Sequence, residues 1–266
     1  MIEFLIDAFR ATHFRGKARL LNPTVARSGV KQAKVFGSTF QLDLSDFIQR
    51  QIYSGTFEGT ETRWVRNHLK PGMTFVDAGA NVGYWTALAA SLVGPKGRII
   101  AFEPSPYAFQ RLKDLVEFND LEQVEAINAG LSDLPGQVEL YLGAWGNHTP
   151  TMVPHEAETS TLVAVQTLDY AAERAGIDRI DLIKIDVEGF EFRVLDGAKQ
   201  LLRERRIRAI LCEFNDDWLR AAGSSTESLE RTFRQCGFLE LRRAGPSAAE
   251  NRLFRLVGNK SSGPND

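Results

Sequence analysis

TFVDAGANVG, residues 74–83, joins a short apolar run to a turn of glycine, alanine and asparagine, and the stretch YWTALAASLV follows it. The apolar run predicts a buried strand over 74–79, and the following stretch predicts a helix that ends near Val93. Glycine accepts a positive φ and lets a ligand approach the backbone, while asparagine tolerates the left-handed region better than other side chains. A cofactor is therefore expected to lie against this turn, at the start of the helix.

The alternation of apolar runs and helical patterns continues along the chain. Further strands are expected at 98–104, 124–132, 180–186, 207–214, 237–244 and 251–258. Helices are expected to end near residues 119 and 205, and another is expected from about 226 to 236. Such alternation is typical of a doubly wound α/β fold, with a mostly parallel sheet and helices on both faces.

Two regions are longer than this pattern requires. The stretch between the third strand and residue 180 exceeds an ordinary crossover, and it contains two segments that alternate like antiparallel strands. We therefore expect an inserted β-hairpin at about 137–168. Residues 1–70 are expected to form an N-terminal helical or extended cap, 71–260 the cofactor-binding domain, and 261–266 a flexible tail. Substrate selection is expected to reside in the cap and the insertion.

Composition excludes several classes of protein. The 266 residues include 32 Lys and Arg and 34 Asp and Glu, so the net charge of −2 gives no general attraction for a nucleic acid. No apolar run reaches 18 residues, so no membrane insertion is expected. Cys212 and Cys236 have the spacing of neither a zinc site nor a redox pair, which favours a reduced, cytoplasmic compartment. The oligomeric state stays open, a homo-oligomer included.

The glycine turn departs from the pattern that binds dinucleotides. Its spacing is Gly79-x-Asn81-x-Gly83 rather than Gly-x-Gly-x-x-Gly, and Asp77 puts a negative charge where a diphosphate would lie. A cationic ligand suits Asp77 better. Glu103 ends the second strand 24 residues after Gly79, near the expected position of an acid that accepts hydrogen bonds from ribose hydroxyls. These residues indicate a nucleoside cofactor without a diphosphate, with an NAD-dependent oxidoreductase as an alternative.

A third acid follows the third strand. Asp133 comes directly after Ser132, and a side-chain acceptor at this position can take a hydrogen bond from the exocyclic amine of an adenine. An aspartate that precedes Pro135-Gly136 is also a common turn former. Both interpretations of Asp133 remain open at the level of sequence.

Several segments between residues 50 and 215 resemble the motifs of a known family. They are FVDAGANVGYWTALAA, GRIIAFEPSPYAFQRL, NAGLSD, QTLD and DLIKIDVEGFEFRVLDGA. Together they are similar to the motifs of the FkbM-type S-adenosylmethionine-dependent methyltransferases. Tyr53-Ser-Gly55-Thr-Phe57-Glu58 and Pro71-Gly72 also stand where that family has similar residues.

The resemblance implies a class I methyltransferase fold, with seven strands of which the last is antiparallel. It also implies S-adenosylmethionine as cofactor and O-methylation of a hydroxyl on a small natural product or a sugar. By the same resemblance, Asp77, Gly79, Asn81 and Gly83 would line the methionine end of the cofactor. Glu103 would hold the ribose, and Asp133 would lie near the adenine. An N-methyltransferase and a noncatalytic cofactor-binding module stay open as alternatives.

The fourth strand carries the candidate catalytic residues. In Lys184-Ile-Asp186-Val-Glu188 the alternation of a strand places the three charged side chains on one side. A lysine in a central strand is costly to bury unless it is paired, so Lys184 is expected to contact Asp186, Glu188 or Glu213, in a catalytic or a scaffolding role. Asp186 is the preferred general base or substrate orienter, because strand ends open onto the ligand crevice in this fold class. Glu188 is the second candidate.

Two further sets are weaker candidates. Asp186, Glu213 and Asn215 would supply oxygen ligands for a hard divalent cation if the strands at 180–186 and 207–214 are neighbours. The favoured alternative pairs Glu213 with Lys184 and makes Asn215 a cap or turn residue. Residues of the insertion can also contact the acceptor, and the candidates are Trp145, His148 and His155.

Overall fold

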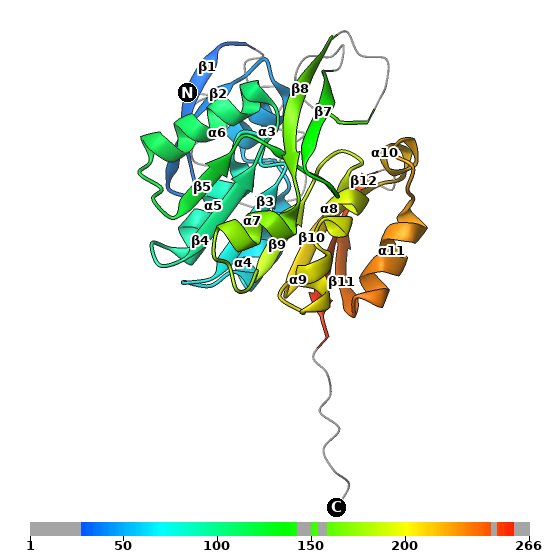
Figure 1. Ribbon diagram of the computed structural model, residues 1–266. Helices are drawn as coiled ribbons and strands as arrows, with labels where there is room; N and C mark the ends of the chain where they lie inside the picture. The colour runs from blue at the N-terminus through cyan, green and yellow to red at the C-terminus, as the bar shows by residue number, and fades with distance from the viewer. Residues whose placement is uncertain (1–27, 143–149, 154–158, 246–248, 258–266) are drawn as a thin grey trace, which may run out of the picture.

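The computed structural model describes residues 28–142, 150–153, 159–245 and 249–257. Within them, a central seven-stranded sheet has the order β11-β12-β10-β9-β3-β4-β5 (Figure 1). Its strands are β3 (Thr74–Ala78), β4 (Arg98–Phe102), β5 (Val124–Ile127), β9 (Leu182–Ile185), β10 (Ala209–Asn215), β11 (Phe238–Ala244) and β12 (Ala249–Leu256). β12 is antiparallel to β10 and β11, and the other neighbours are parallel. The expected fold class, with its antiparallel last strand, is confirmed.

Helices cover both faces of the sheet. They are α3 (Phe47–Ser54), α4 (Gly59–His68), α5 (Tyr84–Val93), α6 (Pro106–Phe118), α7 (Leu168–Arg174), α8 (Glu191–Asp196), α9 (Lys199–Arg203), α10 (Asp216–Ala221) and α11 (Thr226–Gln235). Local chemistry fixes several of their starts. The Ser105 side chain caps α6 directly before Pro106, and Ser225 and Ser228 form a capping box at the start of α11.

Two expected elements are each divided in two. The strand expected at 124–132 is β5 followed by β6 (Gly130–Leu131), because Gly130 leaves the central sheet and pairs in parallel with β8. The helix expected to reach Arg205 is interrupted between α8 and α9. Gly197 lies in this break, and a Cβ atom on it would be 2.1 Å from the carbonyl oxygen of Ser132. The backbone at Gly197 therefore approaches the backbone at Ser132 more closely than any residue with a side chain allows.

The inserted hairpin is present as expected. β7 (Gly136–Leu142) and β8 (Thr159–Gln166) pair antiparallel, and β6 joins them in a separate three-stranded sheet. Its buried side chains, among them Leu140 and Val163, pack against Phe190 just after β9. In Figure 1 the hairpin rises beyond the upper edge of the central sheet. The insertion therefore stands at the end of the sheet where β9 finishes.

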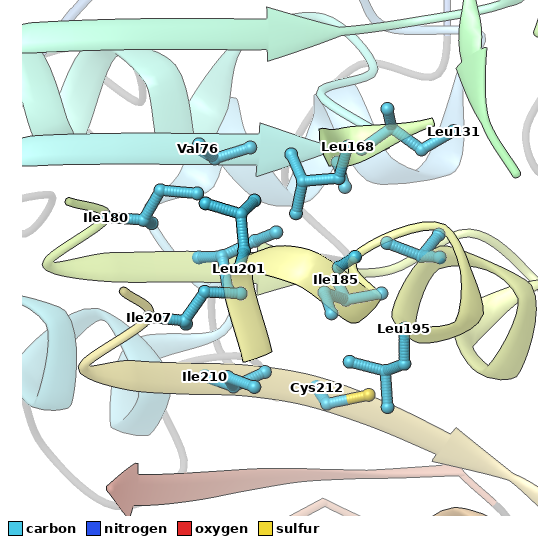
Figure 2. Close-up of a cluster of buried hydrophobic side chains, with 14 of the residues drawn as sticks. Val76, Leu131, Leu168, Ile180, Ile185, Leu195, Leu201, Ile207, Ile210 and Cys212 are labelled. Atoms are coloured by element: carbon cyan, nitrogen blue, oxygen red, sulfur yellow. The ribbon is translucent and has the colours of Figure 1, made fainter. Parts of the chain in front are cut away.

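The two faces of the sheet have separate cores. One face packs on α5 and on the N-terminal segment, residues 28–70, which contains the hairpin of β1 (Val30–Val35) and β2 (Ser38–Asp43) together with α3 and α4. The other face packs on α7, α8, α9 and α11, and Figure 2 labels Val76, Leu201 and Ile210 among the side chains of that layer. Because adjacent strand residues point to opposite faces, each strand contributes to both cores.

Some expectations concern parts of the chain that lie outside the described residues. They are the first 27 residues of the expected N-terminal cap and the tail at 261–266. Among the helices that are described, none has the length and apolar character needed to cross a bilayer.

Candidate functional site

The glycine turn after β3 is held by its neighbours on both sides. The backbone N–H groups of Gly79 and Ala80 both donate to the carbonyl oxygen of Phe102, at 3.0 and 2.9 Å. Gly79 has a φ of 85°, and a Cβ atom there would lie 1.9 Å from the carbonyl oxygen of Asp186. Asn81 also lies in the left-handed region, with a φ of 50°, as its residue type suggested. The turn therefore brings the ends of β3, β4 and β9 together.

Asp77 lies beneath this turn. Its side chain has no exposed surface, and its Oδ2 accepts a hydrogen bond of 2.6 Å from the Thr86 hydroxyl on α5. Burial raises the pKa of Asp77 to about 6, although the hydrogen bond from Thr86 and the charge of Lys184 act to lower it. Asp77 is not among the residues that line the cavity described below. Its expected contact with the cofactor stays a prediction.

Glu103 connects the turn to the end of β4. Its two carboxylate oxygens accept hydrogen bonds of 2.8 Å from the backbone N–H groups of Asn81 and Ser105. The residue is 5% exposed, and burial raises its pKa to about 7. Glu103 lines the cavity, and each of its carboxylate oxygens has a further lone pair that can accept a hydrogen bond. The structure thus brings Gly79, Asn81 and Glu103 together, as the sequence predicted.

Asp133 has a different setting. Its Oδ1 accepts a hydrogen bond of 2.9 Å from the hydroxyl of Ser132 and lies 3.3 Å from Nη1 of Arg193. The cavity is lined nearby by Gly130 and Leu131, while Asp133 is absent from its lining residues in the described part of the chain. Contact of Asp133 with an adenine therefore stays a prediction.

One cavity connects the glycine turn with the end of β9. It is lined by Gly79, Asn81 and Glu103 on one side and by Asp186, Val187 and Glu188 on the other. Apolar side chains from the N-terminal segment and the insertion close the remaining walls, namely Ile48, Ile52, Phe57, Leu131, Leu140, Pro150 and Met152. Tyr84 and Trp85 also line it, although both are buried and pack at the start of α5. A mostly apolar pocket with a few converging polar groups is the usual form of a small-molecule site.

The charged residues at the end of β9 form an ion pair. Lys184 has no exposed surface, and its Nζ lies 2.9 Å from Oδ2 of Asp186. Burial acts to lower the pKa of Lys184, but the neighbouring carboxylates, Asp186 first, outweigh burial and hold the pKa above its usual value. The expected pairing of Lys184 is confirmed, with Asp186 as its partner. Lys184 does not line the cavity, whereas Asp186 does, so Lys184 holds the Asp186 carboxylate from the side away from the cavity.

Glu188 follows in a left-handed conformation, with a φ of 50°. Burial raises its pKa to about 8, and the charge of Asp186 acts in the same direction. The turn is held by Glu191, whose Oε1 accepts hydrogen bonds from the N–H groups of Val187 and Gly189. Asp186 and Glu188 therefore line the same cavity, and the hydrogen bonds to Glu191 fix the turn that carries them.

One carboxylate of the next strand in the sheet, Glu213 on β10, lies close to Asp186 and Glu188. One carboxylate oxygen from each of Asp186, Glu188 and Glu213 lies within 4.8 Å of the others. Asn215, which the sequence grouped with Asp186 and Glu213, instead caps α10, with its Oδ1 accepting from the N–H of Trp218 at 3.4 Å. The capping alternative for Asn215 is thus what the structure shows.

Two residues near this group were not candidates from sequence. Glu58 precedes α4 with a φ of 35°, and Oε1 of Glu58 lies 3.4 Å from Nδ2 of Asn251 on β12. Asn251 stands opposite Glu213 in the pairing of β10 and β12. The one signal in the sequence that could have identified Glu58 as a site residue is that it falls in a segment similar to the FkbM family. Trp145, His148 and His155 lie outside the described residues.

Comparisons with known proteins show which family this chain resembles. A family model described as the Methyltransferase FkbM domain matches residues 77–240. Methyltransferase sdnD of Sordaria araneosa is 32% identical over an alignment of 189 positions, and the match covers 59% of this chain and 70% of that protein. The 31-O-demethyl-FK506 methyltransferase FkbM of Streptomyces tacrolimicus is 27% identical over 251 residues, covering 82% and 91% of the two chains.

The fold has a counterpart among solved structures. The METTL16 MTase domain superposes with a TM-score of 0.51 at 14% identity, covering 96% of this chain and 79% of that chain. At this identity the likeness concerns the fold alone.

Proposed function

The chain belongs to the FkbM methyltransferase family, and from this premise we propose that it transfers the methyl group of S-adenosylmethionine to a hydroxyl oxygen of a small natural product or a saccharide. One observation supports this most directly: a single cavity is lined by the residues suited to the nucleoside and by Asp186 and Glu188. The relative that is named as acting on 31-O-demethyl-FK506 supports an oxygen acceptor.

In this proposal each group of residues has a separate task. S-adenosylmethionine supplies a methyl group on a positively charged sulfur, which a nucleophile displaces in line. Glu103 accepts hydrogen bonds from ribose hydroxyls, and the glycine turn lies against the methionine end. Asp186 accepts the proton of the acceptor hydroxyl, because a neutral alcohol is a weak nucleophile. Lys184 holds one oxygen of Asp186 so that the carboxylate keeps its direction.

The walls of the cavity are proposed to select the acceptor. Ile48, Ile52 and Phe57 come from the N-terminal segment, and Leu140 and Met152 from the region of the insertion. We accordingly keep the division into a cap at 1–70, a catalytic domain at 71–260 with its insertion at about 137–168, and a tail at 261–266. A neutral, partly apolar acceptor fits these walls better than a nucleic acid, which would need a basic surface. A cytoplasmic location is part of the same proposal.

The first test is calorimetric titration of the purified chain with S-adenosylmethionine, S-adenosylhomocysteine and NAD. We expect saturable binding of the first two at a 1:1 ratio and none of NAD, because the Gly-x-Asn-x-Gly spacing differs from the pattern that binds a diphosphate. Binding of NAD alone would overturn the cofactor assignment. An acceptor screen with alcohols, amines, saccharides and RNA, read as formation of S-adenosylhomocysteine, then tests the acceptor class. Turnover confined to amines or RNA would contradict the proposal.

Substitution of Glu103 tests the ribose contact. We expect Glu103→Gln to weaken binding of S-adenosylmethionine by about 10- to 100-fold, because hydrogen bonds to a charged group contribute about 1.5–3 kcal/mol. The affinity of the unmodified chain should rise between pH 6 and 8, since the pKa of Glu103 is raised to about 7 and the ionised form accepts the ribose hydroxyls. Calorimetry at several pH values measures both effects.

The control for this test removes the same charge elsewhere. Glu117 is exposed on α6, so Glu117→Gln should bind the cofactor as the unmodified chain does and keep the rise in affinity between pH 6 and 8. The Glu103→Gln variant should lose that rise. Equal affinity of Glu103→Gln and Glu117→Gln would show that Glu103 does not contact the cofactor.

A further inference from the structure

The acidic group of Asp186, Glu188 and Glu213 lies on one face of the sheet, at the end of β9. Lys184, Glu213 and Asn251 each stand two residues from a side chain of the core beneath the N-terminal segment, namely Leu182, Leu211 and Leu253. Side chains two residues apart in a strand point to the same face, so these polar groups face residues 28–70. The oxygens of Asp186, Glu188 and Glu213 that lie within 4.8 Å of one another are gathered at this face.

The charges of this group are far from balanced. Lys184 contacts Asp186, and no salt bridge within 4.0 Å joins Glu188 or Glu213 to a basic side chain among the described residues. Like charges at such separations repel strongly away from bulk water. The Oε2 atom of Glu213 is buried and has no hydrogen-bond partner in the described part of the chain. Carboxylates in this arrangement require a cation or protons to stay together.

A second observation comes from another part of the chain. Asn251 is 7% exposed, and its Oδ1 has no hydrogen-bond partner among the described residues. It stands directly opposite Glu213, and its Nδ2 faces Oε1 of Glu58 at 3.4 Å. The other oxygen of Glu58, Oε2, is likewise buried without a described partner. Buried oxygens of this kind are costly unless something binds them. Neither residue belongs to the group of three carboxylates.

We propose that Asp186, Glu188 and Glu213 bind one hard divalent cation, with the free oxygens of Glu58 and Asn251 completing an oxygen-lined site. Carboxylate and amide oxygens are the ligands that Mg²⁺, Mn²⁺ and Ca²⁺ prefer. Asp186 and Glu188 also line the cavity, so the cation lies where an acceptor hydroxyl would meet it. The proposed consequence for the reaction, orientation of the acceptor oxygen by the cation, rests on the proposed function.

Direct binding of Mn²⁺ tests the site without any acceptor. The chain is treated with a chelator, dialysed and titrated with Mn²⁺, while electron paramagnetic resonance reports the free ion. We expect one saturable site per chain, and we expect Glu213→Gln to weaken it by at least tenfold. Glu122 is exposed and remote from the group, so Glu122→Gln should bind Mn²⁺ as the unmodified chain does. Weak, unsaturable binding to the unmodified chain, or equal affinity in Glu213→Gln, would overturn the inference.

Binding of S-adenosylmethionine separates this inference from the proposed function. If Glu213→Gln still binds the cofactor, the variant is folded. If Glu213→Gln does not fold, Glu188→Gln takes its place in the Mn²⁺ titration. If the unmodified chain binds the cofactor but no Mn²⁺, the cation site is wrong and the methyltransferase proposal stands. If it binds Mn²⁺ but not the cofactor, the proposed function fails while the cation site stands.

Discussion

Asp186→Asn should lower the rate of methyl transfer by roughly 10²- to 10⁴-fold, which is the usual contribution of a general base. Asp186 follows β9, lines the cavity and has one oxygen held by Lys184 at 2.9 Å. Asparagine keeps the shape of the side chain but cannot accept a proton from a hydroxyl. The measurement is the rate of S-adenosylhomocysteine formation with an acceptor identified by the screen.

Cofactor affinity distinguishes a chemical effect from a structural one. The backbone N–H of Asp186 donates to the carbonyl oxygen of Ala78, and a side-chain substitution leaves this bond intact. We therefore expect Asp186→Asn to bind S-adenosylmethionine within about threefold of the unmodified chain, a difference well below 1.4 kcal/mol. Asp217→Asn, at an exposed position on α10, is the matched control and should keep full activity. If Asp186→Asn retained more than half of the activity, Asp186 would not be the base.

Much of the fold can be predicted from sequence because its strands are buried on both faces. β3 and β4 are short, mostly apolar runs with a turn signal at each end, so the sequence indicates their positions. The division of the third strand was missed. Its residues are all compatible with one strand, and only the pairing of Gly130 with Val165, 35 positions away, draws β6 out of the sheet. Such tertiary pairing has no local signal.

The glycine turn and Glu103 were more predictable than the polar residues around the end of β9. Gly79 and Glu103 follow neighbouring parallel strands, and the carboxyl ends of such strands meet at one edge of the sheet. Glu58 and Asn251 were missed as a pair because 193 positions separate them. Their proximity depends on the antiparallel register of β12, which places Asn251 opposite Glu213, and on the packing of the N-terminal segment over that face.

Gly79→Ala should be the most destabilising single substitution in the turn. Its φ of 85° is unfavourable for alanine, which costs about 1–3 kcal/mol, and overpacking adds about 1–3 kcal/mol. The new methyl group would lie 1.9 Å from the carbonyl oxygen of Asp186, and neither backbone can move without disturbing the pairing of β3 with β9. We expect urea denaturation to show a loss of about 2–6 kcal/mol in the free energy of unfolding.

Gly72→Ala provides the matched control, because it carries the cost of a positive φ without the steric clash that Gly79→Ala adds. Gly72 has a φ of 81°, close to that of Gly79, but a Cβ atom there would meet nothing within 4 Å. Gly72→Ala should therefore show the conformational cost alone and keep its affinity for S-adenosylmethionine. The excess loss in Gly79→Ala then measures the close approach of the turn to β9, the same approach that brings Asp186 beside the cofactor turn. Equal losses in both variants would mean that the turn and the end of β9 can separate, and the cavity would then not be preformed.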